Sequence, residues 1–168
     1  MITRRSLLLT ALLAAPAAWG RPRVGALDIR AIERRRLLPQ AAALLDAEPR
    51  TIAATPAPRS PAGRQDYYSE GDYWWPDPAN PGGPYVRRDG RSNPEKFDGH
   101  RDALIAFGRT VPALAALWDL TREPRFASAA VRHLHAWFVD TKTRMNPNLN
   151  HAQAIIGVNS GRAIGVID

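Results

Sequence analysis

The stretch from Asp72 to Glu95 limits what this chain can fold into more than any other segment. It contains two of the five tryptophans and five of the fifteen prolines. Proline removes a backbone donor and fixes φ, so neither a helix nor a central strand is expected to run through it. Long irregular connections in compact domains are usually functional or disordered. Because disordered segments are poor in aromatic residues, the rings here favour an ordered, functional loop.

The same segment places aromatic rings next to cations. Tyr73, Trp74 and Trp75 are followed by Arg87 and Arg88. Ring faces can stack on the apolar C–H face of a pyranose, and a guanidinium can bind a carboxylate through two hydrogen bonds. These residues predict a site for an anionic sugar. A loop that is merely attached to the surface by its aromatic side chains is the alternative, and the residue types alone do not separate the two.

Composition limits the class of protein. The chain has 168 residues, enough for one domain or for a piece of a larger one, and 45% are hydrophobic, enough for a packed core. It has no cysteine, which excludes disulfides and thiolate chemistry. The net charge is +7 and nearly all of the basic residues are arginine. A GC-rich genome explains this bias, as does an acidic partner such as nucleic acid, a membrane or a polyanionic sugar.

Residues 1–20 are predicted to be an export signal. Arg4 and Arg5 precede an apolar run, Leu7–Leu13, and Ala15–Ala17 fits a small-residue cleavage site. The run is too short for a stable membrane anchor. The arginine pair favours the twin-arginine route, with an ordinary Sec signal as the alternative. We therefore expect a periplasmic or secreted protein that has no nucleic-acid partner and, after signal removal, no membrane contact.

Residues 21–65 are expected to form N-terminal helices and a proline-rich connection. Asp28 can cap a first helix, and Pro39 suits the first turn of a second. The connection Glu48–Gln65 is interpreted as an extended segment on the surface, with a flexible linker as the alternative.

Residues 66–168 are expected to be helical after the aromatic segment. Apolar residues recur every three or four positions in Leu104–Trp118 and Phe126–Phe138, which predicts two amphipathic helices. The short connection Thr121–Glu123 makes them antiparallel. Pro112 predicts a kink or break near Gly108–Val111. One hairpin cannot close a core, so a toroid or solenoid of such hairpins is expected.

The histidines do not indicate a metal site. His133 falls on the apolar face of its helix and is interpreted as a core residue, whereas His135 faces away from it. His100, at a helix start, is expected to be a cap or a surface group. No metal and no cofactor are expected.

Amides are concentrated near the C-terminus, in Asn146, Asn148, Asn150 and Gln153, with His151 among them. They predict a polar wall that binds hydroxyls and carboxylates. A capping box formed by Asn150 and Gln153 is the structural alternative.

Glycines then recur every four residues, at Gly157, Gly161 and Gly165, and predict the close-packed face of a helix. This apolar element has no stop signal before Asp168, which suggests a truncated sequence.

Several motifs in Asp66–Asp168 resemble the N-terminal part of the alginate-lyase-domain family of polysaccharide lyases. They are Asp72–Pro78, Pro84–Gly90, Asn93–Glu95, Ala136–Phe138, Thr143–Leu149 and Ala152–Ile155. The resemblance implies an all-α fold, an α/α toroid of antiparallel helical hairpins with the aromatic segment as a lid loop. It also implies a periplasmic or secreted enzyme acting on a polyuronate such as alginate or glucuronan.

The chemistry implied is β-elimination. A uronate lyase must neutralise the C5 carboxylate, remove the C5 proton and protonate the leaving O4. Gln153, the amide nearest the apolar C-terminal segment, is predicted to neutralise the carboxylate. The predicted substrate-binding residues are Tyr73, Trp74, Trp75, Arg87, Arg88, Asn146, Asn148 and His151. The Asn-His motif and the later Arg and Tyr of the family lie beyond the matched residues, so the catalytic base and acid are expected after Asp168.

Two other functions stay open on the sequence. One is a toroidal glycoside hydrolase, for which Asp72, Asp77, Asp89 and Glu95 supply carboxylates. The other is a protein that binds polyuronate without cleaving it. The products would separate them, because only a lyase leaves a C4–C5 double bond that absorbs in the ultraviolet.

Overall fold

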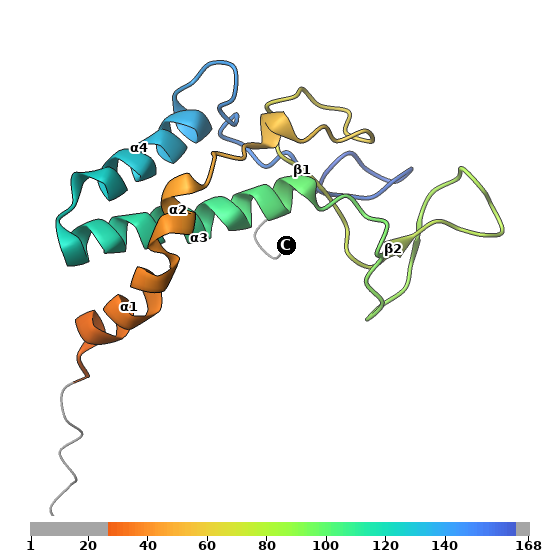
Figure 1. The fold of residues 1–168 in the computed structure, drawn as a ribbon. Helices are drawn as coiled ribbons and strands as arrows, with labels where there is room; N and C mark the ends of the chain where they lie inside the picture. Colours follow the sequence, from red (N-terminus) through yellow and green to blue (C-terminus); the bar gives the residue numbers. More distant parts are fainter. Residues whose placement is uncertain (1–26, 164–168) are drawn as a thin grey trace, which may run out of the picture.

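The computed structural model describes residues 27–163, so the predicted export signal and the last five residues lie outside the described part. The chain is mostly helical, with little sheet (Figure 1). The α-helices are α1 (Ile29–Leu37), α2 (Ala41–Asp46), α3 (Gly99–Thr121) and α4 (Pro124–Phe138). Single 3-10 turns cover Leu38–Gln40 and Ile52–Ala54. The short strands are β1 (Tyr68–Glu70), β2 (Trp74–Trp75), β3 (Val86–Arg87) and β4 (His151–Ala154). The expectation of an all-α chain missed these strands.

The first two helices follow the sequence signals closely. Asp28 caps α1, because its Oδ1 accepts a hydrogen bond from the Ala31 amide at 3.0 Å. Pro39 lies in the 3-10 turn between α1 and α2, whereas it was expected in the first turn of the second helix. Arg30 fixes this pair against α3 by donating to the Asp119 carboxylate at 2.7 Å.

Helix α3 runs through Pro112 without a break, so the predicted interruption near Gly108–Val111 is wrong. Pro112 is exposed, and so is Gly108, whose carbonyl loses its helical donor. Water can replace that donor on an exposed face, and glycine adds no side chain to the crowded turn. By length and composition α3 could also cross a membrane, a criterion that core helices meet as well.

Helices α3 and α4 form the expected antiparallel hairpin (Figure 1). Arg122 adopts a left-handed conformation, φ 61°, that ends α3, and Pro124 begins α4. Helix α4 buries most of its predicted stripe, and only Leu134 and Phe138 of that stripe are exposed. In α3 the buried face is shifted from the prediction, since Leu104 and Trp118 are exposed. One core joins the hairpin to α1 through Leu37, Leu114, Leu117, Leu120, Phe126, Ala129 and Ala130.

A second core joins the helices to the strands. Trp137 of α4 is fully buried against the ring of Phe107, with centroids 4.9 Å apart. Ile52, Tyr67 and Ala152 complete the cluster. Since Ile52 belongs to the connection after α2, that connection is packed into the core and is not a free linker.

The strands lie at the end of α3 that is opposite the α3–α4 turn (Figure 1). β1 and β4 are parallel, with Tyr68 opposite His151 and a register irregularity before Glu70. β2 and β3 form an antiparallel hairpin inside the aromatic segment. The hairpin is regular structure, although the proline content of the segment had predicted an irregular loop throughout.

The segment from Asn150 onward is extended rather than helical as far as it is described. The capping-box alternative for Asn150 and Gln153 is therefore wrong, and so is the helical interpretation of Gly157 and Gly161. These glycines serve turns: Gly157 has φ 73°, and a Cβ on Gly161 would lie 2.1 Å from the Asn150 carbonyl oxygen.

His100 is a buried structural histidine, only 3% exposed, and not the surface group or cap that was expected. Its Nδ1 accepts from the Tyr68 amide at 3.0 Å, and its Nε2 lies 2.8 Å from the Thr55 carbonyl oxygen. These partners require the neutral ring with the proton on Nε2. Burial lowers the pKa of His100. His133 is a core histidine, as predicted; burial lowers its pKa too, and it contacts the Ala47 carbonyl oxygen.

Acidification is expected to destabilise the fold through His100. Its pKa is lower in the folded state, so stability is complete above the unfolded value of about 6.5 and falls as the pH drops below it, by at most about 1.4 kcal/mol per pH unit for one proton. His100→Gln can accept and donate without titrating, and should flatten the dependence of melting temperature on pH. The exposed His135→Gln is the control; an equal flattening there would contradict the assignment.

Candidate functional site

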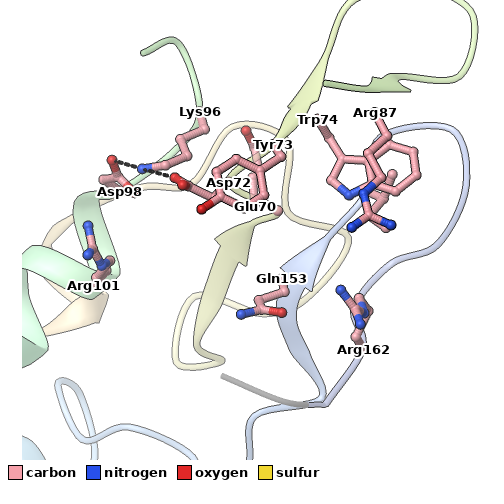
Figure 2. Close-up of a pocket in the computed structure, with 12 residues that line it drawn as sticks. Glu70, Asp72, Tyr73, Trp74, Arg87, Lys96, Asp98, Arg101, Gln153 and Arg162 are labelled. Carbon is pink, nitrogen blue, oxygen red and sulfur yellow. Dashed lines mark hydrogen bonds and ion pairs between the residues drawn. The ribbon is translucent and has the colours of Figure 1, made fainter. Parts of the chain in front are cut away.

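A cleft of about 500 Å³ opens where the N-terminal end of α3 meets the β1–β4 pair and the aromatic segment (Figure 2). Charged, amide and aromatic side chains gather in it from these elements. Its lining consists of Glu70, Gly71, Asp72, Tyr73, Trp74, Arg87, Lys96, Asp98, Arg101, Gln153, Ile155 and Arg162.

Gln153 enters the cleft from β4 in a strained backbone conformation. Its φ is 52°, in the left-handed region that residues with a Cβ adopt at a cost. The backbone N–H of Gln153 donates to the Ser69 hydroxyl oxygen at 3.0 Å, and this bond ties the strained residue to β1. Strain of this kind persists where the surrounding structure enforces it, often at functional sites. The strained conformation makes Gln153 a candidate functional residue of the cleft.

Arg101 places a guanidinium on the cleft whose Nε is without a partner among the described residues. Its Nε is buried and has no hydrogen-bond acceptor among residues 27–163. It occupies the first turn of α3, where the helix dipole disfavours positive charge. A buried donor without a protein partner can be satisfied by ordered water or by an acceptor on a ligand. The sequence analysis missed Arg101, although an arginine in the first helical turn directly after the aromatic segment was a usable signal.

Two further arginines lie on the cleft. In Figure 2 Gln153 lies between Arg101 and Arg162, so the amide is flanked by guanidinium groups. Arg87 pairs with Asp89 at 2.6 Å, but both side chains are more than 60% exposed and the pair contributes little to stability. Arg87 can therefore exchange its partner at small cost.

Lys96 holds two carboxylates at the edge of the cleft. Its side chain is 9% exposed, and its ammonium contacts Asp98 closely and Asp72 at 3.5 Å. Asp72 also accepts from the Ser92 hydroxyl at 2.7 Å. One cation between two carboxylates leaves one net negative charge, which limits the repulsion of an anionic ligand.

Glu70 is a buried carboxylate with all of its partners in place. Arg59 binds it through two hydrogen bonds of 2.7 Å, and the Tyr68 hydroxyl and the Phe97 amide each donate at 3.0 Å. Burial alone would raise the pKa of Glu70, but the hydrogen bonds from Arg59 and Phe97 lower it overall. A general acid needs a raised pKa, so Glu70 is built to stay ionised.

The cleft brings together four of the residues predicted to act at the site, namely Tyr73, Trp74, Arg87 and Gln153. Trp75 and Arg88 lie outside its lining. They pack on one another, with the Arg88 guanidinium 5.3 Å from the ring centroid, and the Trp75 indole donates to the Arg91 carbonyl oxygen at 2.8 Å.

Asn146, Asn148 and His151 also lie outside the lining. The amide nitrogens of Asn146 and Asn148 approach Asp66 Oδ1 at 2.8 Å and 3.5 Å, and the bond from Asn146 is the main reason that the pKa of Asp66 is lowered. His151 Nδ1 contacts the Ser160 carbonyl oxygen at 3.0 Å. The two asparagine contacts hold the loop before β4 in place, and the His151 contact joins the start of β4 to the segment that follows it.

The carboxylates considered for a hydrolase do not converge on the cleft. Asp72 lines it, whereas Asp77, Asp89 and Glu95 do not. Within residues 27–163 there is also no group of three histidine or acidic side chains placed to hold a metal ion.

Comparison with known proteins agrees with this geometry. The family model for alginate lyases matches residues 51–168. The chain is similar to the crystal structure of an alginate lyase from Bacteroides ovatus, with 37% sequence identity and a TM-score of 0.70. The similarity covers 82% of this chain and 37% of that lyase, so the chain spans little more than a third of its length. No curated protein matches. The family model covers both the strands and the helical hairpin that enclose the cleft, and the chain belongs to the alginate lyase family.

Proposed function

We propose that this chain forms the substrate-binding part of a polysaccharide lyase that cleaves a polyuronate, such as alginate or glucuronan, by β-elimination. The observation that carries the proposal is the buried Nε of Arg101, which has no acceptor among the described residues and lies on the same cleft as Gln153. A uronate carboxylate supplies the missing acceptor and can form two hydrogen bonds with the guanidinium.

The remaining lining fits a sugar ring. Tyr73 and Trp74 offer faces for the apolar side of a pyranose. The amide of Gln153 can donate to the C5 carboxylate as negative charge develops there in the transition state. The base that removes the C5 proton and the acid that protonates O4 are proposed to come from residues C-terminal to those described.

The apolar surface of the hairpin supports a larger helical assembly. Val131, Phe138 and Val139 on or next to α4 are more than half exposed, and Trp118 on α3 is 42% exposed. Further helical hairpins would cover these side chains, as in an α/α toroid, and the aromatic segment would then act as a lid over its mouth.

Product analysis tests the reaction class. Polyuronate incubated with the complete enzyme, including the C-terminal residues proposed to supply the base and the acid, should gain the ultraviolet absorbance of a C4–C5 double bond in step with new chain ends. New reducing ends without that absorbance would replace the proposal with a hydrolase. A polymer that binds but stays intact would identify a binding protein.

Arg101→Ala tests the carboxylate contact. Loss of a hydrogen bond to a charged group costs about 1.5–3 kcal/mol, which predicts roughly ten- to hundredfold weaker binding of a uronate oligosaccharide. The salt dependence of binding should weaken as well, because one charge contact is lost. Titration by tryptophan fluorescence or calorimetry gives both quantities.

Arg109→Ala is the matched control, because Arg109 is an exposed arginine further along the same helix. If both variants lose affinity equally, Arg101 acts only through the net charge of the protein and the proposed contact is wrong.

A further inference from the structure

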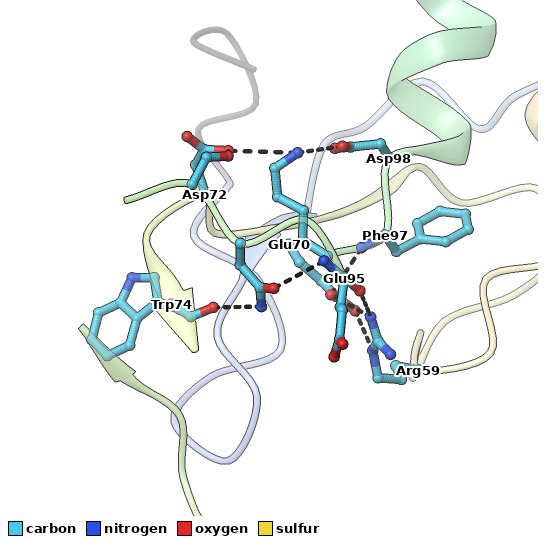
Figure 3. Close-up of polar contacts among 10 residues, drawn as sticks. Arg59, Glu70, Asp72, Trp74, Glu95, Phe97 and Asp98 are labelled. Carbon is cyan, nitrogen blue, oxygen red and sulfur yellow. Dashed lines mark hydrogen bonds and ion pairs between the residues drawn. The ribbon is translucent and has the colours of Figure 1, made fainter. Parts of the chain in front are cut away.

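The aromatic segment runs from Asp72 to Glu95, and one buried side chain joins its outgoing and returning limbs. Asn93 is 2% exposed. Its Nδ2 donates to the Trp74 carbonyl oxygen at 2.9 Å, and its Oδ1 accepts from the Glu95 amide at 2.9 Å. The backbone N–H of Asn93 donates to the Asp72 carbonyl oxygen at 2.8 Å. Figure 3 shows its partners Trp74 and Glu95 with the dashed bonds that they make.

The other contacts between the limbs are more exposed or belong to the backbone. Ser92 donates to Asp72 at an exposed position, and the Trp75 indole donates to Arg91 at another. β2 and β3 pair over only two residues each. Asn93 is therefore the one contact here that combines deep burial with use of both ends of a side-chain amide. A buried amide whose two ends are both bonded cannot be replaced without leaving partners unsatisfied.

The two limbs carry opposite sides of the cleft. Tyr73 and Trp74 belong to the outgoing limb, and Lys96 and Asp98 follow the returning limb. The returning limb is itself fixed to the core, because Arg59 donates to both Glu70 and the Glu95 carbonyl oxygen (Figure 3). The bond from Asn93 to Trp74 thus sets how far the aromatic rings stand from this fixed side.

We propose that Asn93 is a positioning residue that clamps the aromatic segment at its base and so holds Tyr73 and Trp74 at the cleft. Its contribution to polyuronate binding rests on the proposed function; the clamp itself does not. Among the described residues the Asn93 side chain is hydrogen-bonded to the Trp74 carbonyl oxygen and the Glu95 amide, both backbone groups, so it acts through the rings that it places.

Hydrogen exchange of Asn93→Ala tests the clamp. Amides in residues 72–95 should exchange about tenfold faster or more, the size expected when a buried carbonyl and a buried amide lose their partners. Amides of α3 and α4 should keep their rates. Asn93→Asp retains the acceptor for Glu95 but cannot donate to Trp74, so it should also loosen the segment. Ser92→Ala, which removes the adjacent exposed bond, is the control and should change little.

Affinity for alginate and glucuronan oligosaccharides, measured on the same proteins, separates the clamp from the function. Affinity should fall about tenfold in Asn93→Ala and stay near wild type in Ser92→Ala. Equal acceleration of exchange in α3 and α4 would reduce Asn93 to a general stability residue and overturn the proposal, as would unchanged exchange in residues 72–95. Failure of the wild-type protein to bind either oligosaccharide would instead count against the polyuronate assignment, while the exchange data still decide the clamp.

Discussion

Gln153→Ala is expected to lower kcat for polyuronate cleavage by roughly tenfold to a thousandfold, the range for losing one donor to a developing oxyanion. Stability should change little, because alanine keeps the left-handed backbone cost at this position. The comparison of kcat with melting temperature on one variant is informative, since a purely structural residue would lower the second and not the first.

Gln153→Gly sharpens this test. Glycine adopts a φ of 52° without a steric cost, so the variant should gain about 1 kcal/mol of folding stability while losing the same activity as alanine. Gln153→Glu keeps the shape but brings a negative charge towards the substrate carboxylate, and should also be inactive at neutral pH. Full activity in the glycine variant would remove the Gln153 side chain from the mechanism.

Trp137→Ala is expected to destabilise the fold by about 3–5 kcal/mol, the range for a large buried ring. Trp137 is fully buried and packs on Phe107 in the core beneath the strands. Denaturant titration of the free energy of unfolding would measure the effect. The exposed Ser128→Ala on the same helix should stay within about 0.5 kcal/mol.

Trp137→Phe is the discriminating variant. The indole nitrogen of Trp137 is buried and has no hydrogen-bond partner among the described residues. Phenylalanine keeps most of the ring contact and removes the unsatisfied donor, which by itself costs about 1–3 kcal/mol. The net loss should be about 1 kcal/mol. A loss as large as that of alanine would show that the indole nitrogen is bonded after all.

The helical part of the fold was largely predictable from local signals. The cap at Asp28 and the start of α4 at Pro124 each depend on one residue and its sequence neighbours. Periodicity located α3 and α4 and most of the buried face of α4, but not the buried face of α3, which tertiary packing selects. The prediction of a break at Pro112 was made without knowing that Pro112 is exposed. It also overlooked that the residue four positions earlier, whose carbonyl loses its donor, is Gly108.

The site was only partly predictable, because its residues are brought together by distant strand pairing. The sequence pointed to Tyr73, Trp74, Arg87 and Gln153, whose types alone suggest sugar chemistry. It could not show that Trp75 packs on Arg88, because a sequence does not reveal whether a ring and a cation contact each other or are free to bind a ligand. It also could not show that the Arg101 Nε has no acceptor among the described residues, because that is visible only once the neighbouring residues are placed.

The pairing of β1 with β4 has a consequence for the order of folding. Tyr68 pairs with His151, a residue far away in the sequence, because both α3 and α4 lie between the two strands. Helices α3 and α4 are themselves joined by a short turn. Contacts between neighbouring segments form quickly, and contacts of high sequence separation wait until the loop-closure entropy has been overcome. The helical hairpin can therefore assemble first and serve as the template on which β1 and β4 meet. The cleft, which requires both strands, is then among the last parts of the chain to exist during folding.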